Sequence, residues 1–503
     1  MGPERRLHPL SFLFSMGQHL TSLLLPGVAL FFTAGSRGDR WELWLTVLIV
    51  PYTIAAVARS LSYRYRFAEE EMVVRTGWIF RSERHIPYAR IQNIDAIQTV
   101  FHRLVGVAEV RVETAAGGEP EATMTVLPVT AMEEMRQLVF AARLEAAPAA
   151  APRTSDVPAS DGGVMLRLPA REVLLYGLVE SRGAVVLAGG LGVLWELGLF
   201  ERFFERAATG AGGGGVLRQL VRSAFSHAGG PTLAAVAQTI AAFVGLILVL
   251  RVLSMAWAFV RLYGFTLRRA GDDLRFEYGL LTRVSGTVPQ RRIQTLTVSG
   301  SPLHRLFRRA SVHVDTAGGD GGEAQRTRRE PIAPLVRERD VGGILAVLLP
   351  EVNLSAVAWQ PCDPRAVRRV RFRGAVMSGI VCLPLALAPR VWAIAVIAVL
   401  AAWTWFYAGK YVAALGWSLE RDAVVYRRGW LWPQVTIARF AKVQAVTRKE
   451  SPFDRRTGMA AVAVDTAGAD GNRRIDIPFL PAATATWLAG ALGAAAARTP
   501  FRW

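Results

Sequence analysis

Asp-Thr pairs followed by small residues are the first candidates for chemistry in this chain. The string VDTAGGDGG occupies residues 314–322, VDTAGADG occupies 464–471, and the related VETAAGG occupies 112–118. Asp-Thr before a small residue is typical of the catalytic turn of aspartic proteases, in which two carboxylates share one proton. The alternative is a hydrophobic strand that ends in a glycine turn and is used three times.

Glutamate in the first copy argues against a protease. The two carboxylates of a dyad must lie at a fixed short distance, and the longer side chain of Glu113 would change that distance. Alanine follows each threonine, whereas the protease turn has glycine there. We therefore interpret Glu113, Asp315 and Asp465 as acids that face solvent at the end of a strand, followed by a turn.

Other catalytic and metal-binding patterns are absent from the sequence. It contains no GxSxG, HExxH or GxxxxGK[ST] string, and its seven histidines are scattered. Its two cysteines, Cys362 and Cys382, are too few for a disulfide framework or a structural zinc site. We predict no metal, no cofactor and no enzymatic activity.

Composition and charge indicate a membrane and an anionic partner. The chain has 503 residues, enough for several domains, and 52% of them are hydrophobic. Lysine and arginine total 59 against 40 acidic residues, a formal net charge of +19. Such an excess favours nucleic acid or the cytoplasmic leaflet, and long apolar runs favour lipid over nucleic acid.

Six apolar runs form three pairs, each typical of a transmembrane hairpin. They are 10–32 with 43–58, 183–200 with 231–250, and 374–389 with 391–407. The first run has no charged residue over 23 positions, enough to span a hydrocarbon core of about 30 Å. Basic residues flank the same end of each pair, so the positive-inside rule places both termini and the polar segments in the cytoplasm.

The polar segments that follow these pairs are copies of one another. Glycine, glutamine, arginine and threonine recur at constant spacing over 37 residues without a gap. The aligned sets are Gly77, Gln92, Arg103 and Thr114; Gly279, Gln294, Arg305 and Thr316; and Gly429, Gln444, Arg455 and Thr466. The repeating unit is one apolar hairpin plus one polar domain, present three times.

The polar domain has the pattern of a small antiparallel sheet closed by a helix. In the first copy, 63–68, 71–80 and 83–89 resemble short strands, and VAEVRVET alternates clearly. Thr130 and Glu133 form a capping box that opens an amphipathic helix. We predict an α+β membrane protein with three transmembrane helical hairpins, each followed by a small antiparallel β-barrel capped by a C-terminal helix.

Several motifs of the first copy carry a family resemblance. They are Gly77, Ile86-Pro87, Arg90-Ile91-Gln92, Leu104-Val105-Gly106 and the strand and turn at 112–117. The polar unit resembles the bacterial pleckstrin-homology-like (PH-like) domain, the YdbS-like PH domain family. The whole chain is similar to YdbT-type membrane proteins, which carry three such domains between transmembrane hairpins. The resemblance implies PH-like barrels and a bacterial inner membrane.

The predicted organisation has seven segments. They are hairpin 1 (1–60), PH-like domain 1 (61–145), a linker (146–165), hairpin 2 (166–260), PH-like domain 2 (261–350), hairpin 3 (351–412) and PH-like domain 3 (413–503). The linker is rich in alanine, proline and serine, a composition typical of disorder.

Repeated basic residues form the candidate binding face for anions or a partner. They are Arg90, Arg292 and Lys442 at one aligned position, and Arg103, Arg305 and Arg455 at another. Arginine suits phosphate because it can donate two parallel hydrogen bonds. The alternative is a solvated basic surface near anionic lipid. For the repeated glutamines, hydrogen bonds to neighbouring backbone are a better explanation than ligand binding.

These observations favour a membrane-anchored interaction or scaffold protein, for example in envelope stress or toxin defence. Its expected partners are the lipid bilayer, another membrane protein or a second copy of itself, and anionic lipid head groups, but no nucleic acid. A lipid-binding or lipid-transport protein is the alternative, and a membrane enzyme is disfavoured because the acids and histidines are scattered.

Overall fold

A computed structural model describes most of the three polar domains and part of the apolar segments. The described residues are 4–7, 62–77, 81–114, 122–145, 163–180, 233–316, 331–382, 390–466 and 475–498. The predicted first hairpin, the apolar run at 183–200, and residues 146–162 of the linker lie outside these ranges.

The three polar domains, called units 1, 2 and 3 below, share one order of elements. Unit 1 contains β2 (Arg64–Phe67), β3 (Glu71–Thr76), β4 (Ser82–Pro87), η1 (Tyr88–Arg90), β5 (Ile91–Gln98), α3 (Val100–Val105), β6 (Val107–Thr114), β7 (Ala122–Pro128) and α4 (Val129–Glu145). Strand β1 (Arg5–Arg6) adds to β2. The order is therefore three strands, a 3₁₀ turn, a strand, a short helix, two strands and a long helix.

Units 2 and 3 repeat this order. Unit 2 contains β9 (Thr266–Ala270), β10 (Asp273–Tyr278), β11 (Arg283–Pro289), η2 (Gln290–Arg292), β12 (Ile293–Ser299), α10 (Pro302–Leu306), β13 (Arg309–Thr316), β14 (Ala333–Arg337) and α12 (Glu338–Leu348). Unit 3 contains β15 (Gly416–Leu419), β16 (Ala423–Arg428), β17 (Gln434–Arg439), η4 (Phe440–Lys442), β18 (Val443–Lys449), α15 (Pro452–Thr457), β19 (Met459–Thr466), β20 (Ile475–Pro481) and α16 (Ala482–Arg498). The internal repeat of the sequence is thus a structural repeat.

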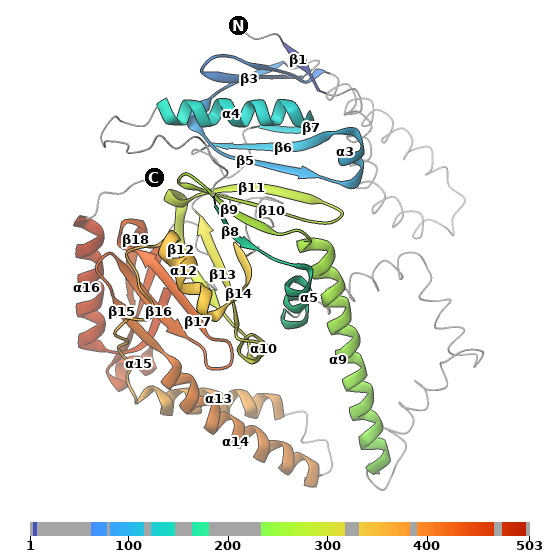
Figure 1. Ribbon diagram of the computed structural model, residues 1–503. Helices are drawn as coiled ribbons and strands as arrows, with labels where there is room; N and C mark the ends of the chain where they lie inside the picture. The colour runs from blue at the N-terminus through green and yellow to red at the C-terminus, as the bar shows by residue number, and fades with distance from the viewer. Residues whose placement is uncertain are drawn as a thin grey trace, which may run out of the picture.

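Each unit divides its six strands between two antiparallel sheets. In unit 1 the strands β2–β4 form one sheet with β1, whereas β5–β7 belong to another. Helix α4 packs on the second sheet, as Figure 1 shows. The predicted closed barrel is not seen among the described strands. The 3₁₀ turn directs the chain out of the first sheet, and in units 1 and 2 a strand of the next unit occupies the edge that closure would use.

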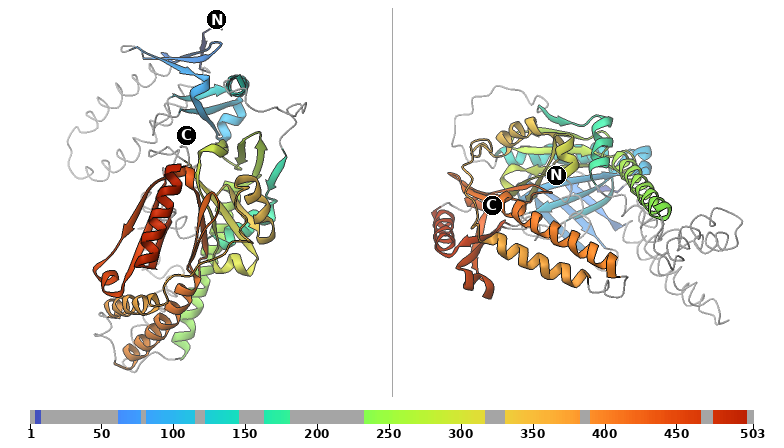
Figure 2. Two further views of the ribbon diagram at one scale, coloured as in Figure 1. Left: turned by 90° about the vertical axis from the view of Figure 1, so that its left-hand side faces the viewer. Right: turned by 90° about the horizontal axis from the view of Figure 1, so that it is seen from below.

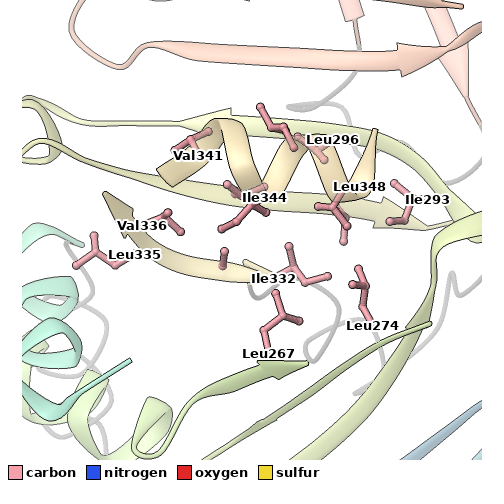
Figure 3. Close-up of a cluster of buried hydrophobic side chains, with 14 of the residues drawn as sticks. Leu267, Leu274, Ile293, Leu296, Ile332, Leu335, Val336, Val341, Ile344 and Leu348 are labelled. Atoms are coloured by element: carbon pink, nitrogen blue, oxygen red, sulfur yellow. The ribbon is translucent and has the colours of Figure 1, made fainter. Parts of the chain in front are cut away.

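The core of unit 2 lies between its two sheets and its long helix. Figure 3 shows side chains from all three parts directed toward one another: Leu267, Leu274, Ile293, Leu296, Ile332, Leu335, Val336, Val341, Ile344 and Leu348. Leu274 and Leu296 are fully buried, which stabilises the fold by about 1.5–3 kcal/mol for each leucine. The same core cluster continues into unit 3 through Ala423, Val425 and Ile437.

The repeated glycine marks a tight turn between the second and third strands of each unit. Gly77, Gly279 and Gly429 have φ angles of 100°, 118° and 83°. A Cβ atom on Gly279 would lie 1.9 Å from the carbonyl oxygen of Thr282, and one on Gly429 would lie 2.1 Å from that of Trp432. Glycine is required there because other residues rarely adopt this backbone conformation.

Two described helices are long and apolar enough to cross a membrane. The candidate spans are Ile240–Leu262 within α9 (Leu233–Leu262) and Val396–Ala414 within α14 (Arg390–Ala414). Most of their side chains are exposed. Figures 1 and 2 show that both helices extend from the sheets toward the same end of the molecule.

Each of these long helices packs against a second helix. Helix α5 (Ala170–Val179) approaches α9 at Gly177, where a Cβ atom would lie 2.5 Å from Cα of Met255. In the predicted third hairpin, α13 (Ala366–Cys382) packs on α14. The hydroxyl groups of Ser378 and Thr404 lie 3.2 Å apart across that contact. The turn at 383–389 lies outside the described residues.

Candidate functional site: the junctions between units

Consecutive units are joined by strand pairing. Strand β5 of unit 1 pairs antiparallel with β11 of unit 2, and β12 of unit 2 pairs antiparallel with β17 of unit 3. The result is one sheet with the order β7-β6-β5-β11-β10-β9-β8, in which β8 is Val164–Arg167, and another with the order β14-β13-β12-β17-β16-β15. Each junction therefore joins the second sheet of one unit to the first sheet of the next (Figure 1).

The two junctions use the same register. At the first junction Ile97 lies opposite Val284. At the second junction Ser299 lies opposite Gln434. The sequence repeat aligns Ile97 with Ser299 and Val284 with Gln434. The internal repeat thus extends to the contact between units.

The repeated arginines of the short helices reach across the junctions. Nη1 of Arg103 donates a hydrogen bond to the carbonyl oxygen of Leu280 at 3.0 Å. Arg305 donates in the same way to the carbonyl oxygen of Trp430. Each acceptor immediately follows the repeated glycine of the next unit. Arg455 is exposed in unit 3, the last of the three units described.

The other repeated basic position changes its surroundings along the chain. Arg90 in unit 1 is exposed, whereas Arg292 and Lys442 are only 9% and 4% exposed. Burial lowers the pKa of Lys442, and the positive charges of Arg439 and Arg291 lower it further. Arg292 and Lys442 follow β11 and β17, which pair with a preceding unit. Arg90 follows β4, which is an edge strand among the described residues. The six predicted basic residues therefore do not form one exposed face.

The first junction also encloses a small cavity of about 40 Å³. Asn93 and Asp95 of unit 1 line it together with Phe276, Thr287 and Arg292 of unit 2. A cavity of this volume has room for ordered water beside the buried polar groups of Asn93 and Asp95.

A larger hollow lies at the second junction, with a volume of about 990 Å³. Its lining contains Arg305, Arg339 and Glu338, together with Arg309, which is ion-paired with Glu172. Leu345 and Leu354 contribute apolar surface. Its size matches that of sites that hold small molecules.

The repeated glutamines and threonines also differ between copies. Nε2 of Gln294 donates to the carbonyl oxygen of Arg292 at 3.3 Å, the backbone role expected from the sequence. Gln444 is exposed, and the side chain of Gln92 lies outside the described atoms. Thr466 is buried, whereas Thr114 and Thr316 are half-buried.

The expectation that the acids of the Asp-Thr strings face solvent is wrong for Asp315. Asp315 does not face solvent: it is 8% exposed and accepts a hydrogen bond from Oγ1 of Thr295 at 2.7 Å. Thr295 lies on β12, directly opposite Asp315 on β13. The aspartate therefore links two strands inside unit 2. The predicted glycine turns at 317–330 and 467–474 lie outside the described residues.

Sequence reasoning missed the strand pairing between units. A signal was present in the charges of the aligned strands. The internal strand β12 has the uncharged sequence IQTLTVS, but its equivalent β18 ends in Arg448 and Lys449. The internal strand β17 has no charge before Arg439, but its equivalent β4 contains Glu83 and Arg84. The end strands thus carry charges that their equivalents at the second junction lack, whereas the first junction includes Asp95 of β5 and Arg283 of β11.

Comparison with known proteins agrees with the threefold organisation. The profile of the bacterial PH domain matches residues 21–143, 229–352 and 374–496, one match for each unit. The chain is 20% identical over 415 residues to the UPF0699 transmembrane protein YdbT of Bacillus subtilis (strain 168), covering 78% of either chain. No solved structure matches the chain. This chain is a membrane protein with three PH-like repeats and belongs to the bacterial PH domain family.

Proposed function

We propose that the protein is a membrane-anchored interaction module without enzymatic activity. One observation carries the proposal: consecutive units contact each other by strand pairing and by a repeated arginine that donates to a backbone carbonyl of the next unit. The equivalent strands at the two ends of the row, β4 and β18, remain at sheet edges. Exposed sheet edges bind other chains by adding a strand.

The proposed anchor is a set of three transmembrane hairpins in the bacterial inner membrane, with the units and both termini in the cytoplasm. The exposed apolar helices α9 and α14 support this arrangement. Helix α13 begins with four arginines, Arg368, Arg369, Arg371 and Arg373, which suit the cytoplasmic side. Envelope stress or toxin defence is one setting for such a module.

Binding of an anionic lipid is the second candidate. The hollow of about 990 Å³ at the second junction favours it, because arginines and leucines line it together. Such a lining suits a ligand with a negative head group and an apolar tail.

Purification of the full chain in lipid nanodiscs from native membranes, followed by mass spectrometry, tests both candidates. We expect a stoichiometric protein, either a second membrane protein or additional copies of this chain. Its amount should fall in the variants Arg90→Glu and Arg455→Glu, which change the exposed ends of the row. Arg421→Glu is the matched control, because Arg421 lies in the exposed turn between β15 and β16 and on neither edge strand.

Enrichment of one anionic lipid without any protein would contradict the interaction proposal and favour the second candidate. That enrichment should then be lost in Arg339→Glu, because the side chain of Arg339 lines the hollow.

A further inference from the structure

We propose that copies of this chain assemble head to tail, with β18 of one copy pairing with β4 of the next in the register of the internal junctions. This inference rests on the proposed interaction function and names a second copy of the chain as the partner. The chain already makes this contact twice within itself, and β18 and β4 are the equivalents, at the two ends of the row, of the strands that form it.

Both strands are the equivalents of strands that pair internally. Strand β4 corresponds to β11 and β17, which accept a preceding unit, and β18 corresponds to β5 and β12, which meet a following unit. In the described part of the chain, β4 and β18 are edge strands of two different sheets. Strands β4 and β18 therefore do not pair with each other within one molecule.

Exposure separates the end strands from their internal equivalents. Residues Ile293–Thr297 of β12 are all buried, whereas the aligned part of β18 is exposed at Gln444, Ala445 and Thr447. On β4, the four residues from Ser82 to His85 are exposed. The ends thus offer backbone groups and side-chain faces that are covered at the internal junctions.

The internal register predicts which residues would meet. It places Lys449 opposite Ser82 and Arg448 opposite Glu83, as Ser299 lies opposite Gln434 and Val298 opposite Val435. One position further, Glu450 would lie opposite Arg81, as Gly300 approaches Pro433. Two opposite-charge pairs therefore face each other, an arrangement that stabilises antiparallel strands.

Charged residues on edge strands also prevent unwanted pairing, so charge alone does not identify a partner. The distribution of signs distinguishes the two roles. Edges of equal sign repel each other in any register, but here Glu83 meets Arg448 and Arg81 meets Glu450 in the register already used twice. A shift by one residue would place Glu83 opposite Thr447 or Lys449 and move side chains to opposite faces.

The repeated arginine provides a third contact. Arg103 and Arg305 donate to the carbonyl oxygen that follows the repeated glycine of the next unit. Arg455 is the exposed third member, and it follows β18 as Arg103 follows β5 and Arg305 follows β12. Because β18 and β4 are different surfaces, the contact is heterologous and forms a ring or an open row.

Disulfide trapping of the full chain in native membranes tests the register. The variant with both Ser82→Cys and Lys449→Cys should form a ladder of dimers and larger species on mild oxidation, because opposed residues on antiparallel strands lie within disulfide reach. Each single variant alone should not form the ladder, which also controls for Cys362 and Cys382. Ser82→Cys with Thr447→Cys, two residues out of register, should give at least about fivefold less product.

Charge exchange tests the pairing independently. Glu83→Arg and Arg448→Glu should each lower the amount of assembled protein about fivefold, and the double variant should restore it to within about twofold of the natural chain. Glu70→Arg is the control, because it makes the same change in the adjoining β2–β3 turn. Association is measured by mass photometry in nanodiscs.

Absence of the ladder together with no recovery in the double variant would overturn head-to-tail assembly. The interaction function fails separately: if assembly is absent but a different protein still accompanies the chain, that function stands. If neither is found, both proposals are wrong.

Discussion

Arg90, Arg292 and Lys442 hold the same place in the three units, yet only Arg90 is exposed. The difference arises from the neighbours of each unit, since β11 and β17 pair with a preceding unit and β4 does not. A residue type that suits an anion site on a single unit therefore becomes part of a protein contact inside the row.

His304 makes the stability of unit 2 depend on pH. Its Nδ1 accepts the backbone N–H of Ser301 at 3.2 Å, its Nε2 lies 3.1 Å from Oγ of Ser311, and burial lowers its pKa to about 4. As the pH falls from about 6.5 to 4, the unfolded chain binds a proton that the folded chain does not. The free energy of unfolding should therefore decrease by roughly 2 kcal/mol over that range, allowing for solvent screening.

Thermal unfolding in detergent at several pH values measures this effect. His304→Asn keeps an acceptor for the Ser301 N–H without a titratable group, so its unfolding temperature should vary less between pH 4 and 6.5 than that of the natural chain. Equal pH dependence in both proteins would contradict the assignment.

Gly279 is the second residue-scale test. Gly279→Ala should destabilise the fold by at least about 1 kcal/mol, because its φ is 118° and the added Cβ would collide with the carbonyl of Thr282. Gly490→Ala in α16 is the matched control, since nothing lies within 4 Å of the position a Cβ would take. It should stabilise the protein by about 0.5–1 kcal/mol. Chemical unfolding compares the two, and equal effects would contradict the turn requirement.

The element that organises the molecule is the shared edge between β5 and β11, and again between β12 and β17. Strand pairing joins the two units along one edge. The arginine on the short helix of the first unit adds a second contact, a hydrogen bond to the next unit. The short helix is itself positioned by a capping box, formed by Thr99 with His102 in unit 1 and by Ser301 with His304 in unit 2.

Removing the arginine should loosen a junction without unfolding either unit. In Arg103→Ala, amide hydrogen exchange should become about fivefold faster in 283–285 of β11, because one hydrogen bond contributes about 1 kcal/mol. Arg305→Ala should act in the same way on 434–438 of β17. Hydrogen exchange with mass spectrometry measures both. Arg455→Ala should leave exchange at both junctions unchanged, and a general increase in all three variants would argue against a local role.

At the scale of the whole molecule, the three units form a row linked by continuous sheets, with apolar helices extending from it (Figures 1 and 2). Unit 1 and unit 2 are therefore attached by non-covalent pairing as well as by the chain between them. Tethering several weak sites on one anchor raises their effective concentration, so the whole row should bind a multivalent target more tightly than one site does.

Cutting the chain between the first two units tests this attachment. A protease site inserted within residues 146–162 should allow cleavage in detergent, and the two fragments should remain together during gel filtration. Ser285→Pro is the comparison, because proline removes an N–H group and disturbs β11 where it pairs with Ala96. Separation of the fragments in the cleaved natural chain would show that the junction does not hold without the linker.

The sequence alone showed the threefold repeat, several strands and the closing helix of the unit, and the family. These features are periodic or rest on constant spacing: Val110 and Val112 alternate with charged residues, and the same residue types recur at fixed intervals. The tight turn at Gly77, which falls inside a strand predicted at 71–80, and the short helix between β5 and β6 were seen only in the structure. Two long apolar helices also agree with runs recognised in the sequence.

The contacts between units are visible only in the folded molecule. Strand β5 could pair with a strand of its own unit and close a barrel, or pair with β11 of the next unit, as it does. The two possible partners compete for the edge of β5, and the local pattern of apolar residues along the chain does not distinguish them. The same competition buried Arg292 and Lys442 and left Arg90 and Gln444 exposed, whereas Asp315 is buried by a contact inside unit 2. Identical motifs acquire different environments because burial depends on the neighbouring unit, and the units at the two ends each lack one neighbour.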